Sequence, residues 1–170
     1  DTLYKHIVTY LGRISQLNLN HSQSEKILDL MSSVNALENV GDLIQTNMVG
    51  LGLRRIEHGL KISEPSQKVI NTVHMVVSDA LKASIRAVVE DDKDYAIRVV
   101  SMKDDMERLG READLHQAKR LTAEDSGKFE TYSVEIDIIE KMKRIFHHSR
   151  NIAKTVVSQN SEKSAYNPAA

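Results

Sequence analysis

Apolar residues recur along this chain at intervals of three and four positions, the spacing that places side chains on one face of an α-helix. A short run of this kind covers residues 3–14, and a longer one follows residues 22–25, which have the capping-box sequence Ser-Gln-Ser-Glu. The apolar and small positions of the longer run are Ile27, Leu30, Val34, Leu37, Gly41, Ile44, Met48 and Leu51. We expect them to form one buried seam along a long helix.

The same spacing predicts three further helices, with apolar positions over residues 69–87, 95–113 and 138–156, the second of them ending near Leu121. A serine cap with a first-turn proline at residues 63–65 and an acidic run at residues 90–94 mark boundaries between them. Short connections make consecutive helices antiparallel neighbours. The expected fold class is therefore all-α, an up-and-down antiparallel helical bundle of one short and four longer helices. A single extended coiled coil is the alternative, and the loop signals disfavour it.

Composition supports helices and excludes several functions. Seven glycines and two prolines among 170 residues leave few helix breakers. A formal net charge of −1 argues against a nucleic-acid partner, and the absence of cysteine excludes disulfides and thiolate metal sites. The sequence has no apolar run long enough for a membrane span and no signal-peptide pattern, so we expect the chain itself to be soluble. Because the helical pattern is present from the first residues, we expect the chain to begin inside a helix or inside a longer protein.

Two carboxylates four residues apart, Glu38 and Asp42, share one face of the second predicted helix. Gly41 beside them costs about 1 kcal/mol relative to alanine inside a helix, which suggests that something approaches closely there. A hard cation bound by carboxylate oxygens fits that description. Two solvated or salt-bridged acids beside a helix contact are the alternative.

Other candidate chemistry is weaker, and no motif of an enzyme active site occurs, so we expect no catalytic residue. Glu112 and His116 have metal-ligand spacing, but no third ligand accompanies them, and a solvated helix face is the better interpretation. The last helix carries the one concentrated basic patch, which suits phosphate, a lipid headgroup or an acidic partner, with a solvated face as the alternative. Its candidate contact residues are Lys143, Arg144, His147, His148 and Arg150.

Residues 37–42, Leu-Glu-Asn-Val-Gly-Asp, resemble the hallmark of PhoU-like proteins, which is usually written around a Leu-Glu-Arg-Ile-Gly-Asp core. That family consists of two three-helix repeats with the hallmark on the third helix of each. The resemblance implies the end of a truncated first repeat at residues 1–60 and a complete second repeat at residues 64–158, before a disordered tail at residues 159–170. With an offset of 105 residues, Lys143 and His147 stand in the second repeat where the acids stand in the first.

The resemblance also implies a function. An iron or divalent metal site is expected at Glu38 and Asp42 alone, and the chain is expected to regulate rather than catalyse. The basic last helix looks most like the C-terminal domain of bacterial sodium/phosphate cotransporters. This implies a regulatory domain at the cytoplasmic face of the inner membrane, partnered by the transmembrane portion of the same protein and by a second copy in a homodimer. A stand-alone regulator of phosphate uptake is the alternative, and a metal-binding bundle of other function is less favoured.

Overall fold

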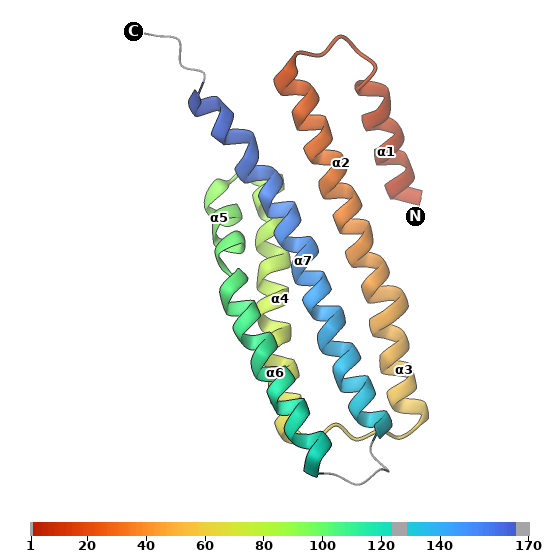
Figure 1. Ribbon diagram of the computed structural model, residues 1–170. Coiled ribbons are helices and arrows are strands. Elements are labelled where there is room, and N and C mark those ends of the chain that lie inside the picture. The colour runs from red at the N-terminus through yellow and green to blue at the C-terminus, as the bar shows by residue number, and fades with distance from the viewer. Residues whose placement is uncertain (1, 124–128, 166–170) are drawn as a thin grey trace.

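The chain is almost wholly helical in the computed structural model, which describes residues 2–123 and 129–165 (Figure 1). Those residues contain no strand, which confirms the all-α fold class, and none of their helices has the length and apolar character of a bilayer span. The elements are α1 (Thr2–Ile14), α2 (His21–Asp42), the π-helix η1 (Leu43–Met48), α3 (Val49–Glu57), α4 (Glu64–Glu90), α5 (Lys93–Ser101), α6 (Lys103–Ala123) and α7 (Phe129–Ala165).

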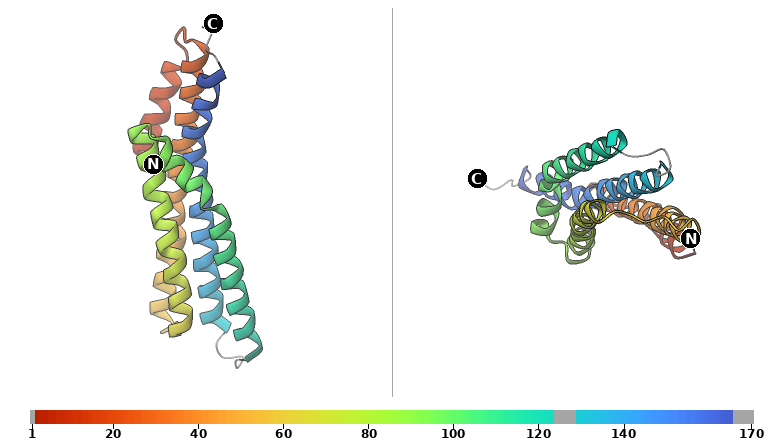
Figure 2. Two further views of the ribbon diagram at one scale, coloured as in Figure 1. Left: turned by 90° about the vertical axis from the view of Figure 1, so that its left-hand side faces the viewer. Right: turned by 90° about the horizontal axis from the view of Figure 1, so that it is seen from below.

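These elements form five rods that run along one long axis (Figure 2). α2, η1 and α3 follow one another without a gap, and α5 and α6 are separated by Met102 alone. One short and four longer rods were expected, but the rod predicted over residues 95–113 bends. The amide of Met102 bonds back three residues, to the carbonyl oxygen of Val99 at 3.3 Å, and this tighter turn interrupts the α-helical pattern.

α7 lies at the centre of the bundle, between α2 and α4 in Figure 1, and contacts every described element except α1. The apolar stripe predicted for this helix is buried, and its most buried members are Ile139, Met142, Ile145, Phe146, Ile152, Ala153 and Val156. A hydrogen bond of 3.0 Å between the buried hydroxyls of Ser33 and Thr155 also joins α2 to α7. The last predicted helix is therefore the one around which the others pack.

Small side chains let the helices approach α7 closely. Ala80 and Ala87 on α4, Ala96 on α5, Ala113 on α6 and Ala153 on α7 are all fully excluded from solvent. A helix surface built from alanine brings backbones near one another while still removing apolar surface from water, at about 25 cal/mol per Å². The alanines thus set the spacing of the bundle.

The seam predicted for the second rod is wrong in its middle part. Leu37 and Ile44 are 39% and 44% exposed and Gly41 is exposed, while Val40 and Leu43 are buried. The buried positions Ser33, Ala36, Val40 and Leu43 still follow steps of three and four residues, one position earlier than the predicted seam, and the period changes only after Leu43. In a π-helix the backbone bonds reach five residues back, so the inward face passes from Leu43 to a position five residues later rather than three or four.

Two predicted helix boundaries are confirmed and one is wrong. Ser63 caps α4 by accepting a hydrogen bond from the amide of Ser66, and Asp91 ends α4 in the left-handed conformation at φ 50°. The capping box at residues 22–25 is not the start of α2. Asn20 instead exchanges hydrogen bonds with Gln23, at 2.9 and 3.0 Å, so the helix begins earlier.

The disordered tail expected at residues 159–170 stays a prediction. α7 extends to Ala165, and residues 166–170 lie outside the described residues. No glycine or proline occurs between the buried part of α7 and Ala165, so each added residue extends the backbone ladder without a nucleation cost.

Glu130 at the start of α7 holds the C-terminal end of the continuous α2–η1–α3 rod by ion pairs. Its carboxylate accepts a hydrogen bond from His58 Nδ1 at 2.6 Å and one from Arg54 Nε at 3.3 Å. The bond from His58, followed by that from Arg54, holds the pKa of Glu130 below its usual value. The carboxylate thus stays charged and keeps α3 against the first turn of α7.

We predict that Gly41→Ala stabilises the chain by about 0.5–1 kcal/mol, because alanine loses less backbone entropy in a helix. A Cβ atom at Gly41 would meet no atom within 4 Å among the described residues. The matched variant is Gly110→Ala on α6, whose Cβ would lie 3.1 Å from Lys143 Cε and should gain less or nothing. Urea unfolding measures both, and a destabilised Gly41→Ala would show that something does pack against this glycine.

Candidate functional site

The two predicted metal ligands lie at the end of α2, where the chain enters the π-helix. Glu38 is half-buried and Asp42 is exposed. Short π segments occur often at functional sites because they displace the side chains around them. The acidic pair therefore sits beside the one irregular turn of this rod.

The described residues do not complete a metal site around this pair. No group of three or more histidine, cysteine or acidic side chains able to hold a metal occurs in the described part of the chain. A hard cation takes six or more oxygen ligands, of which these two carboxylates supply only a fraction. The expected close approach to Gly41 is likewise not made by any described residue.

Glu112 and His116 do not act together as ligands. Glu112 accepts a hydrogen bond from Arg108 at 2.9 Å, and His116 is hydrogen-bonded to the hydroxyl of Ser66 at 3.1 Å. Their interactions are those of a helix surface and a helix contact, in keeping with the interpretation favoured from the sequence.

The structure divides the predicted basic patch of α7 between two environments. Lys143, His147 and Arg150 line a pocket of about 430 Å³ between α6 and α7, and Arg144 and His148 do not. The rings of His147 and His148 meet edge to face at 5.8 Å between centroids. Three of the five predicted contact residues therefore line the pocket and two do not.

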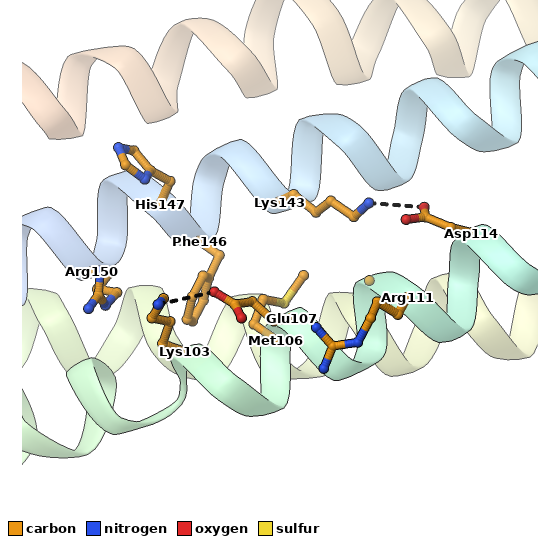
Figure 3. A pocket seen from close by; sticks show the side chains of 10 residues that line it. Lys103, Met106, Glu107, Arg111, Asp114, Lys143, Phe146, His147 and Arg150 are labelled. Carbon is orange, nitrogen blue, oxygen red and sulfur yellow. Dashed lines mark hydrogen bonds and ion pairs between the residues drawn. The ribbon is translucent and has the colours of Figure 1, made fainter.

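The pocket is built from facing turns of α6 and α7 (Figure 3). Its lining residues are Lys103, Met106, Glu107, Gly110, Arg111, Asp114, Lys143, Phe146, His147 and Arg150. Figure 3 shows Phe146 pointing from α7 toward α6, Lys143 reaching toward Asp114, and His147 pointing away from α6. Phe146 and Met106 are nearly fully buried and form an apolar floor, above which the charged side chains lie.

Lys143 crosses the pocket and is held by two carboxylates. Its ammonium lies 2.7 Å from Glu140 on its own helix and 3.1 Å from Asp114 on α6. Partial burial on its own would lower the pKa of Lys143, but the hydrogen bonds to these two carboxylates outweigh it and raise the pKa above its usual value. Lys143 stays protonated and links α6 to α7.

The pKa of His148 shifts in the opposite direction. Burial, then the neighbouring His147 and Arg144, lower its pKa below the ordinary histidine value. The imidazole is therefore held neutral more firmly in the folded chain than in an unfolded one.

Sequence reasoning missed the α6 side of the pocket. Lys103, Glu107 and Arg111 are spaced by four residues and so share a helical face. That spacing was available from the sequence, but which helix the face meets depends on how α6 and α7 are aligned.

Comparison with known proteins identifies the family. The PhoU domain model matches residues 70–156, just over half of the chain. No match was found among curated proteins or among solved structures. The matched range includes every residue that lines the α6–α7 pocket and excludes Glu38 and Asp42.

The chain belongs to the PhoU domain family. Membership indicates a regulatory role in phosphate transport. The division into a truncated and a complete repeat, and the metal at the acidic pair, stay predictions.

We predict that any metal bound by the full-length protein depends on Glu38 and Asp42, the only copy of the acidic hallmark. The double variant Glu38→Ala/Asp42→Ala should lose that metal in elemental analysis of the purified protein. The control is Glu25→Ala/Asp29→Ala, which removes two acids with the same spacing from the same helix. Equal metal contents in the wild type and the first variant would contradict the assignment.

We predict that His148 lowers stability in mild acid. As the pH falls below 6.5, the unfolded chain takes up this proton before the folded chain does, so the free energy of unfolding decreases. Urea unfolding at about pH 7.5 and about pH 5.5 should show a smaller decrease for His148→Gln than for the wild type. His147→Gln removes one cause of the shift and should fall between them, whereas three equal decreases would refute the assignment.

Proposed function

We propose that this chain is the cytoplasmic regulatory domain of a sodium-dependent phosphate transporter and modulates transport by the membrane portion of the same protein. The observation that carries the proposal is the PhoU domain match over residues 70–156. A homodimer at the inner face of the membrane is part of the proposal.

The loss of the acidic hallmark on α7 supports attachment to a transporter rather than a stand-alone regulator. Lys143 and His147 occupy the positions that correspond to Glu38 and Asp42, and the first of them forms ion pairs with Asp114 and Glu140. A lysine ammonium repels a metal cation, so the second half of the chain is suited to contacts other than metal binding. The resemblance of the basic last helix to cotransporter tails points the same way.

Regulation requires that the domain contact the transporter differently in two states, because only a difference in interaction free energy shifts an equilibrium. α7 is placed to convey such a difference, since it contacts α2, α4, α5 and α6 together. A shift of α7 would change its contacts with several helices at once.

We predict that deleting this domain from the full-length gene product changes phosphate uptake or its response to external phosphate. The measurement is sodium-dependent uptake of radiolabelled phosphate in cells that lack their own phosphate transporters. The amount of inserted protein, measured by immunoblot of the membrane fraction, is the control, because the transmembrane portion should still insert.

Two outcomes would remove the proposed attachment. One is an inserted deletion form with the same uptake rate and the same response to external phosphate. The other is a native gene that encodes no membrane segment. In either case the stand-alone regulator becomes the better assignment, and membership of the family is unaffected.

A further inference from the structure

The α6–α7 pocket carries more positive charge than its own carboxylates neutralise. Its charged lining residues are four cations and two carboxylates: Lys103, Arg111, Lys143, Arg150, Glu107 and Asp114. With Glu140, which pairs with Lys143 at 2.7 Å from outside the lining, one positive charge remains in excess, in a concave site with low-dielectric walls that concentrate the field.

The two lysines of the pocket are already ion-paired within it. Lys103 Nζ lies 3.2 Å from Glu107 Oε1, and Lys143 Nζ lies 3.1 Å from Asp114 Oδ1. The excess charge therefore belongs to the two arginines, which come from opposite walls.

Arg150 is the better placed of the two to hold an anion. Its side chain is half-buried, and its Nε is buried without a hydrogen-bond partner among the described residues. No carboxylate pairs with Arg150 among the described residues, so an anion at its terminal nitrogens would meet a positive charge that is not already neutralised. Arg111, which has no ion-pair partner in the described part of the chain, lines the same pocket from α6 and adds to the field.

The ligand class follows from the shape and the donors. A guanidinium offers a planar fork that matches phosphoryl oxygens, and a phosphate monoester near neutral pH carries the negative charge that the unpaired arginines can bind. Between the charged groups lies the apolar floor of Met106 and Phe146, which suits an organic group rather than a hydrated ion. The volume of about 430 Å³ lies within the range of small-molecule sites.

We propose that the α6–α7 pocket binds a small organic phosphate, with its phosphoryl group on Arg150 and its organic part on Met106 and Phe146. Arg111 adds to the positive field of the pocket. This goes beyond the proposed function, because binding by the 170-residue chain does not depend on attachment to a transporter. A PhoU domain with this pocket would respond to a phosphorylated metabolite directly.

The test is calorimetric titration of the 170-residue chain at about 0.15 M ionic strength with adenosine monophosphate, inorganic phosphate and adenosine. Adenosine monophosphate should bind at least roughly tenfold more tightly than either of the others, because it alone offers both the phosphoryl group and the organic part. Arg150→Gln should weaken its binding by roughly tenfold or more, Arg150→Lys by less, and Arg111→Gln severalfold.

The matched control is Arg144→Gln, which removes the same charge from the same helix outside the pocket. It should leave binding unchanged, and circular dichroism should show all variants equally helical. Three results would overturn the proposal: no binding of adenosine monophosphate, equal affinity for inorganic phosphate, or equal weakening by Arg144→Gln and Arg150→Gln. The last of these would show binding to the general charge of α7. None of them bears on phosphate uptake by the full-length protein.

Discussion

Burial of the apolar face of α7 against α2, α4 and α5 is the interaction on which the rest of the structure depends. α2 and α4 both pack on α7 along much of their length, and α5 packs on α7 as well as on α4. The hydrophobic effect needs only that apolar area be removed from water, but the alanines at positions 80, 87, 96 and 153 decide how closely the helices approach. The opposite edge of α7 is then free to carry charged residues toward α6.

Much of this fold was predictable from the sequence because long helices repeat their signal many times. The broad stripe of α7, the cap at Ser63 and the turn in the acidic run at residues 90–94 depend on local chemistry, and the structure contains them. The buried face of α2 was predicted one position too late, because Val34 and Leu37 are more apolar than Ser33 and Ala36, which are the residues that face the core. A period of 3.6 residues also assumes a regular backbone, so the irregular turns at η1 and at Met102 were missed.

The candidate sites were predictable only as far as they lie on one helix. Lys143, His147 and Arg150 share a helix and were found as part of a charged run. Their counterparts Lys103 and Arg111 belong to another helix, and only the tertiary alignment of α6 with α7 brings them into the same pocket. The same limit applies to Glu38 and Asp42, whose spacing was evident but whose surroundings depend on residues far away in the chain.

The π-helical turn at Leu43–Met48 carries one residue more than an α-helical backbone needs. Removing any single residue there would let the rod continue as an ordinary helix, with the inward face passing from Leu43 to a position four residues later instead of five. The wider turn thus absorbs the surplus residue, and α2 and α3 both keep one face against α7. In a regular helix the same extra residue would rotate one end by about 100° relative to the other. The rod therefore accommodates at this turn a change of length that it could not accommodate elsewhere along its contact with α7.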